Sequence, residues 1–103
     1  MESKIRASRQ TLRVLGVLVK KPSAWRYGYS LSRETDLQSG TLYPILMRLE
    51  ERGWLETRWE TPPPGGRPPR HMYRLTSSGR ACAVEAISAA RSRGGLQWAP
   101  ERG

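Results

Sequence analysis

The sequence predicts a mostly α-helical domain that carries a two-stranded β hairpin. Two observations predict this fold class. Apolar residues recur at helical spacing in three stretches of the chain, and the middle stretch, residues 40–52, is followed at once by an alternating segment and a loop rich in proline and glycine. A chain of 103 residues has the length of one domain. We therefore expect a single domain in which helices flank a hairpin.

The first predicted helix spans residues 4 to about 20 and ends before Pro22, because proline disfavours helical geometry in the residue before it. One apolar stripe on this helix is the expected core face. A second stripe lies on the opposite side, where a surface helix needs none. Another part of the chain or a second copy must cover it, and we expect a dimer interface there. The second stripe consists of Val14, Val17 and Leu18.

A short helix over residues 29–35, a turn at residues 36–38 and a longer helix at about 39–52 follow. Ser39 is a suitable N-cap for the longer helix. Pro44 indicates that the helix starts nearby, because proline is tolerated only in or near the first turn. Gly53 is the expected stop. The residues at i, i+3, i+4 and i+7 form a buried stripe of Leu42, Ile45, Leu46 and Leu49.

Residues 54–60 alternate as a half-buried strand does, and residues 71–75 return as a second strand. The segment between them is too long and proline-rich for a two-residue turn, so we expect a projecting loop. This loop carries Arg67 and Arg70.

Thr76 is expected to cap a last helix that runs to Gly94-Gly95. Ala81, Val84, Ile87 and Ala90 are assigned to its inward face. Small residues on the outward face would let two helices from two copies come close together. They are Cys82, Ala86 and Ala89.

Charge is the most informative property of the composition. The chain has 18 Lys and Arg against 9 Asp and Glu, a formal net charge of +9. A strongly basic balance is the electrostatic footprint of a nucleic-acid-binding protein. Arginine enrichment can also reflect genome base composition, which leaves a generally solubilised surface as the other interpretation.

The same composition argues against several other classes. One cysteine excludes an internal disulfide framework, and one histidine leaves a zinc site short of ligands, so we expect no metal and no cofactor. Acid, base and nucleophile do not gather in any motif, and we expect no enzyme. The charged start has no apolar signal-peptide centre and no segment has the length of a membrane span, so we expect a cytoplasmic protein with no membrane partner.

The order helix, short helix, turn, helix, strand, projecting loop, strand, helix is that of a winged helix-turn-helix. In such folds the second helix of the turn presents its N-terminal residues to base edges in the major groove of double-stranded DNA. Arginines on the projecting loop, the wing, can reach the backbone or the minor groove. The candidate DNA-binding residues are Gln38, Ser39, Thr41, Tyr43, Arg48, Arg67 and Arg70.

The chain from about residue 10 to 92 resembles the PadR family of bacterial transcriptional regulators. The motifs that carry the resemblance are "GTLYP.L.RLEERGW" and "GRPPR..YRLT..GR". The resemblance implies a homodimeric DNA-binding regulator, usually a repressor, sometimes released by a small aromatic ligand. It also implies that Ser39, Thr41 and Tyr43 approach DNA and that the wing touches the backbone. Residues 1–93 would form the DNA-binding domain with its dimerisation helices, and residues 94–103 a flexible tail.

Several assignments stay open at the level of sequence. Tyr43 either contacts DNA or packs under the wing, and Arg48 either contacts DNA or is only solvated. Trp98 either lines a dimer cleft for a flat aromatic effector or docks on its own domain. Trp59 is most simply strand packing. A winged helix that binds a protein partner and never touches DNA is the alternative function.

Overall fold

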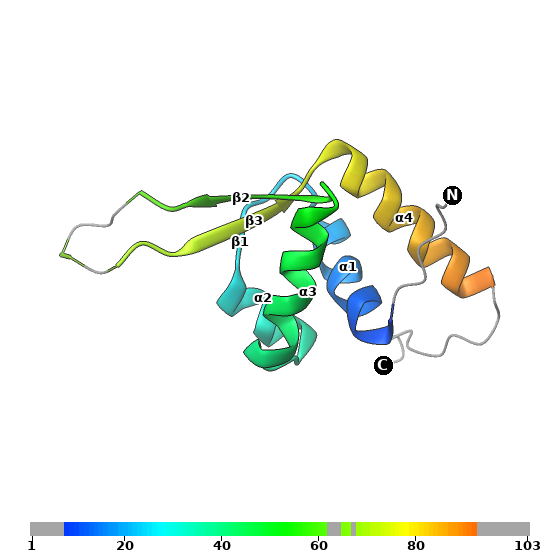
Figure 1. The fold of residues 1–103 in the computed structure, drawn as a ribbon, viewed down its shortest axis with the longest axis horizontal. Helices are drawn as coiled ribbons and strands as arrows, with labels where there is room; N and C mark the ends of the chain where they lie inside the picture. The colour runs from blue at the N-terminus through cyan, green and yellow to red at the C-terminus, as the bar shows by residue number, and fades with distance from the viewer. Residues whose placement is uncertain (1–7, 62–64, 67, 93–103) are drawn as a thin grey trace.

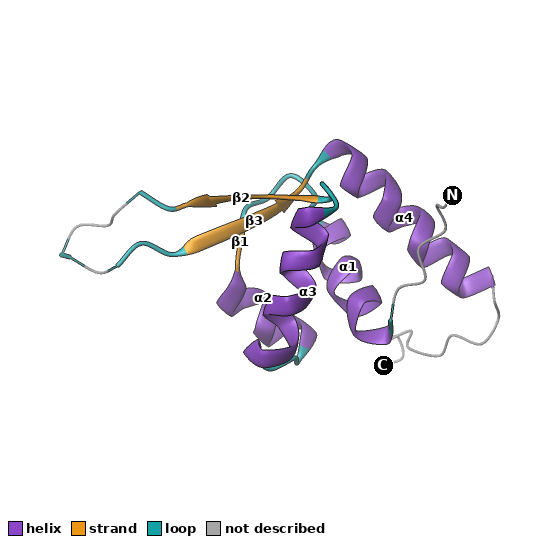
Figure 2. Cartoon of the chain, in the orientation of Figure 1, coloured by secondary structure: helices purple, strands orange, loops and turns teal. Residues whose placement is uncertain are grey.

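The computed structural model describes residues 8–61, 65–66 and 68–92 of the chain. Four helices surround one end of a small sheet, and a hairpin extends away from them (Figure 1). The elements in chain order are α1 (Arg9–Lys20), β1 (Arg26–Tyr27), α2 (Gly28–Thr35), α3 (Ser39–Glu51), β2 (Leu55–Trp59), β3 (His71–Leu75) and α4 (Ser77–Ser92). Figure 2 shows how the two long strands leave the helical layer on one side. The expected winged helix-turn-helix is confirmed.

Helix α1 begins at Arg9, where the Ser8 hydroxyl caps it by accepting a hydrogen bond from the backbone N–H of Thr11 at 3.1 Å. The predicted first turn, residues 4–7, lies outside the described residues. Val14 and Leu15 are fully buried although they lie on different sides of the helix. They can both be buried because α1 packs against α2, α4 and β3 at once.

This central position corrects the expectation for the second apolar stripe of α1. Val14, Val17 and Leu18 are buried inside the protomer, with Val17 only 6% exposed. The stripe is covered by other parts of the same chain, so it needs no second copy.

The helix-turn-helix is formed by α2 and α3. Asp36 has a left-handed backbone with φ of 59°, which turns the chain within three residues, and its N–H donates to the Ser32 carbonyl. Helix α3 begins one residue before the point the sequence suggested, because Gln38 rather than Ser39 is its N-cap residue. Pro44 is the sixth residue of α3, beyond the first turn. The predicted core stripe of α3 is confirmed: Leu42, Ile45, Leu46 and Leu49 are buried.

The end of α3 leads directly into the wing. Gly53 has φ of 80°, and its N–H donates to the Glu50 carbonyl at 2.9 Å. The N–H of Trp54 donates to the Leu49 carbonyl at 2.9 Å. These two bonds are the Schellman arrangement that closes a helix with a glycine in the left-handed region. The strand β2 then begins at Leu55, so two residues separate the C-cap of α3 from the sheet.

The sheet has three antiparallel strands in the order β1-β3-β2. Strands β2 and β3 pair with Leu55 opposite Leu75 and Trp59 opposite His71. The strand β1 was not predicted, because two residues carry no alternating pattern. Its pairing with β3 ties the wing to the segment that enters α2.

Helix α4 is capped as predicted, since the Thr76 hydroxyl accepts from the N–H of Gly79 at 2.9 Å. The assignment of its faces was wrong in part. The buried side holds Gly79, Ala83, Ala86, Ile87 and Ala90, whereas Val84 is 53% exposed. The core therefore covers Ala86, which had been assigned outward, and leaves Val84 on the surface. The expected stop at residues 94–95 lies outside the described part of the chain.

Candidate nucleic-acid interface

The N-terminal end of α3 forms an exposed polar surface. Gln38, Ser39, Gly40 and Thr41 are all exposed. The first N–H groups of a helix have no partner within it, and the helix dipole favours negative charge at that end. The side chain of the N-cap residue Gln38 forms no cap hydrogen bond with α3. The end of α3 is thus suited to a phosphate or to the edge of a base.

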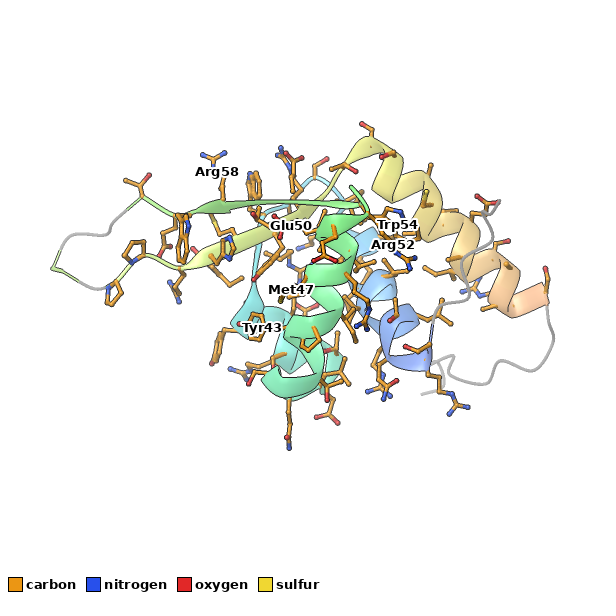
Figure 3. The ribbon with its side chains drawn as sticks, in the orientation of Figure 1. Tyr43, Met47, Glu50, Arg52, Trp54 and Arg58 are labelled. Carbon is orange, nitrogen blue, oxygen red and sulfur yellow. The ribbon has the colours of Figure 1, made fainter. Side chains whose placement is uncertain are left out.

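Tyr43 packs against α2 and is also partly exposed. It is 38% exposed, and it lies over Gly28 at the start of α2. A Cβ atom at position 28 would stand 2.2 Å from the Tyr43 hydroxyl oxygen, so the tyrosine ring fits where glycine has no side chain. In Figure 3, Tyr43 and Met47 point from α3 toward the side of the wing. Tyr43 is therefore packed on one side and free on the other.

Met47 is a site residue that sequence reasoning missed. It is 59% exposed although it is a large apolar residue. A helix turns by about 100° per residue, so Tyr43 and Met47 are neighbours on one edge of the exposed side of α3, while Thr41, Arg48 and Arg52 lie on the other edge. Figure 3 shows Arg52 on the opposite side of the helix from Tyr43. The i, i+4 spacing of Tyr43 and Met47 could have indicated from the sequence that they share one side of the helix.

The face of the wing that is turned toward α3 carries aromatic side chains. Thr57 on this face donates from its hydroxyl to Glu50 of α3 at 3.3 Å. Trp59, two residues further along β2, is 64% exposed and stacks on His71, with ring centroids 4.5 Å apart and an angle of 12° between the planes. Trp59 does pack across the strands, as the sequence suggested, but it stays exposed because β2 extends past the helices that would cover it. We call Tyr43, Met47, Trp59 and His71 the inner surface.

The other face of the sheet is basic and aromatic. The guanidinium groups of Arg58 and Arg74 lie 5.1 and 4.2 Å from the ring centroid of Trp25. Arg74 also pairs with Glu56 at 3.1 Å. Arg58 points away from α3 in Figure 3, as its position next to Trp59 in an alternating strand requires. This outer face is therefore separate from the inner surface.

Arg70 lies at the root of the wing in a cluster with Tyr27 and Glu60. Its Nε is 3.4 Å from Glu60 Oε1, and its guanidinium lies 4.3 Å from the centroid of the Tyr27 ring. The Tyr27 hydroxyl donates to the second oxygen of Glu60 at 2.8 Å. The side chain of Arg70 thus joins β1 to the two long strands. Arg67, the second candidate on the wing, lies outside the described residues.

Tyr73 connects the wing to α3 electrostatically. Burial raises the pKa of its hydroxyl, and the nearby Tyr43 and Glu50 raise it further. The hydroxyl lies 3.3 Å from Nδ1 of His71. Tyr73 therefore stays a neutral phenol at neutral pH, within hydrogen-bonding distance of the His71 ring.

The expected dimer residues are distributed differently from the prediction. Ala89 is exposed and Cys82 is half-buried on α4, whereas Ala86 is buried, as are the three residues of α1. The large apolar residue exposed on the described part of α4 is Val84.

Within residues 8–61, 65–66 and 68–92, no group of three His, Cys, Asp or Glu side chains is placed to hold a metal ion. None of the helices in these ranges is long and apolar enough to cross a membrane. Trp98 lies outside the described residues.

The arrangement of α2, α3 and the hairpin defines a winged helix-turn-helix protein. A family model described as the transcriptional regulator PadR-like family matches residues 14–85. The chain belongs to the PadR-like family of transcriptional regulators. No curated protein matches the chain.

Solved structures are similar over most of the chain. A PadR family transcription regulator from Clostridium difficile has a TM-score of 0.70 and 22% identity, over 84% of this chain and 92% of that one. The protein smu.1704 from Streptococcus mutans has a TM-score of 0.65 and 28% identity, over 89% of this chain and 87% of that one. A probable transcriptional regulator from Pseudomonas aeruginosa has a TM-score of 0.68 and 24% identity, and the chain spans 60% of its length.

Proposed function

We propose that the protein is a homodimeric repressor that binds a specific DNA sequence, acts in the cytoplasm and has no enzymatic activity. Helix α3 enters the major groove with Gln38, Ser39, Thr41 and Tyr43 near base edges, and Arg48 faces the flanking backbone. The wing, with Arg67 and Arg70, lies along the adjacent backbone or minor groove. Residues 1–93 form the functional domain, and residues 94–103 are a tail.

One observation carries the proposal above the others. The exposed, uncapped N-terminal end of α3 and the α3-facing side of the wing lie on the same side of the molecule, as major-groove reading by a winged helix requires. The net charge of +9 supports a polyanionic partner. A protein-binding adaptor, the alternative function, needs neither feature.

The proposal includes a small aromatic effector. The PcaV transcriptional regulator from Streptomyces coelicolor, with a TM-score of 0.64 and 24% identity, was solved in complex with its natural ligand. For the present chain, Trp98 stays the candidate for contact with a small aromatic effector.

The test begins with selection of duplexes from a random DNA pool by the purified full chain. We expect a footprint of two half-sites about one helical turn, roughly 34 Å, apart. If six or more phosphates are neutralised, log K should fall against log salt with a slope of about −0.9 per phosphate. If no sequence is enriched and DNA affinity does not depend on salt concentration, the alternative function as a protein-binding adaptor is favoured.

Mutation of α3 tests its role in reading the sequence. Tyr43→Ala should weaken binding to the selected duplex by about 1–3 kcal/mol and relax the sequence preference, because a contact to a base edge is lost. Arg80→Ala, which removes a charge from exposed α4, is the control and should weaken all duplexes slightly and equally. Titration by fluorescence anisotropy gives both affinities. Equal losses on the selected and scrambled duplexes in the Tyr43 variant would contradict the assignment.

A further inference from the structure

The stacked pair of Trp59 and His71 lies outside the hydrophobic core. Trp59 is 64% exposed, and β2 ends at this residue. An exposed tryptophan gains little from the hydrophobic effect, and a large apolar ring on a surface often marks a binding site. The pair also lies on the inner side of the wing, since Thr57 on the same face of β2 contacts Glu50 of α3.

The pair is held rigidly in place. Trp59 and His71 are directly opposite in the β2–β3 register, which brings their rings together at 4.5 Å. His71 in turn lies 5.0 Å from the ring of buried Tyr73, whose hydroxyl is 3.3 Å from Nδ1. A preorganised contact loses little conformational entropy on binding. A tryptophan fixed in this way is suited to a partner that presents a matching flat edge.

We propose that the Trp59–His71 pair is a DNA-backbone contact, in which the Trp59 ring packs against deoxyribose and Nε2–H of His71 donates to the neighbouring phosphate. Nδ1 of His71 lies 3.3 Å from the Tyr73 hydroxyl oxygen. In the proposed contact the hydroxyl donates to Nδ1, so that the ring carries its proton on Nε2. This inference rests on the proposed function, because it places the duplex between α3 and the inner side of the wing. A polyanionic duplex is the occupant that matches a chain with a net charge of +9.

This contact should have a signature that separates it from the other contacts. A contact with sugar positions the duplex but does not read sequence, so losing the ring should weaken all duplexes equally. Removing an uncharged ring also releases no additional counterion, so the salt slope should not change. Loss of an arginine that contacts phosphate would make the salt slope shallower. Loss of a residue that reads bases would lower the preference for the selected sequence.

The experiment compares three variants of the full chain on two duplexes, the one selected by the wild-type protein and a scrambled one. Trp59→Ala should bind both on the order of tenfold more weakly at an unchanged salt slope, as expected for the loss of an aromatic anchor. Trp59→Phe keeps a ring that can stack and should recover most of the affinity. Trp25→Ala is the matched control, because it removes the same kind of ring from the outer face of the sheet, between Arg58 and Arg74.

The outcomes separate the two proposals. If the wild-type protein selects no duplex, the proposed function fails and this inference fails with it. If it selects one and Trp59→Ala binds as the wild type does, or loses only the preference for the selected sequence, the inference alone is overturned. A Trp59→Ala protein that sediments as a different oligomer also overturns it, because the ring would then lie between copies. Thermal unfolding of each variant confirms that the comparison is made on folded protein.

Discussion

At the scale of single residues, the position of Tyr43 depends on a glycine in another helix. Gly28 starts α2, and the Tyr43 ring occupies the space where a Cβ atom would lie, with two ring carbons 2.9 Å from that point. The obstruction is the end of a side chain that can rotate, and the backbone is not blocked. Gly28 thus sets the direction of a residue that we assign to DNA contact, without contacting DNA itself.

This dependence gives a prediction for Gly28→Ala. The added methyl group should displace Tyr43 and lower the affinity for the selected duplex, by an amount up to the loss of about 1–3 kcal/mol expected for Tyr43→Ala. A double-mutant cycle by anisotropy titration tests the cause. Gly28→Ala should have no further effect once Tyr43 is alanine. Additive losses would mean that Gly28 acts through something other than the tyrosine.

At the scale of elements, the junction between the wing and α4 is organised by Thr76. Its hydroxyl donates to the Gly53 carbonyl at 2.7 Å and accepts from the N–H of Gly79, while its own N–H donates to the Trp54 carbonyl at 2.9 Å. One residue therefore caps α4 and joins it to the end of α3.

Replacement of Thr76 should cost more than its exposure suggests. Thr76→Ala removes an N-cap and the bond to Gly53, so we expect a loss of about 1–2 kcal/mol in the free energy of unfolding. Thr76→Ser retains the hydroxyl and should stay within about 0.5 kcal/mol of the wild type. Urea unfolding followed by circular dichroism measures both. A Thr76→Ala protein as stable as the serine variant would show that water replaces the hydroxyl without cost.

The elements that sequence could predict are those with a local signal. The stripe of α3, the turn at Asp36, the stop at Gly53 and the cap at Thr76 each depend on residues close in the chain, and all appear in the structure. The strand β1 escaped because its evidence is its pairing with β3, far away in the sequence. The faces of α4 were misassigned because alanines and valines give a weak stripe. The part of the candidate site at the start of α3 was predictable from sequence. The exposure of Trp59 was not, because it depends on how far the hairpin extends beyond the helices.

At the scale of the whole molecule, α1 is the centre of the fold, and α4 carries an exposed apolar residue on the side away from the proposed DNA-binding surface. Val14, Val17 and Leu18 are all inside the protomer, while Val84 is 53% exposed beside exposed Ala81 and Ser88. We therefore place the interface of the proposed homodimer on the Val84 side of α4.

Two substitutions distinguish a core position from an interface position. Val17→Glu should unfold the protein, because a buried carboxylate without a partner is one of the most costly changes a core can receive. Val84→Glu should leave the protomer folded and shift the protein to monomers, since only the contact between copies is affected. Circular dichroism and sedimentation velocity are the measurements. A folded monomer from Val17→Glu would restore the α1 interface. An intact Val84→Glu dimer would move the interface away from this side of α4.

The joint at Gly53 and Trp54 has a mechanical consequence for the proposed dimer. The reading helix ends there, the wing begins there, and the Trp54 carbonyl accepts the hydrogen bond from Thr76 and lies 1.9 Å from the position of a Cβ at Gly79. The start of α4 is thus packed directly against the chain that leaves α3. In the proposed dimer, each protomer would then move as one body about the contact between the two α4 helices. A small rotation at this contact would produce a larger displacement of the two α3 helices, because they lie farther from it. The distance between half-sites that the dimer accepts would therefore be set at α4, far from any base.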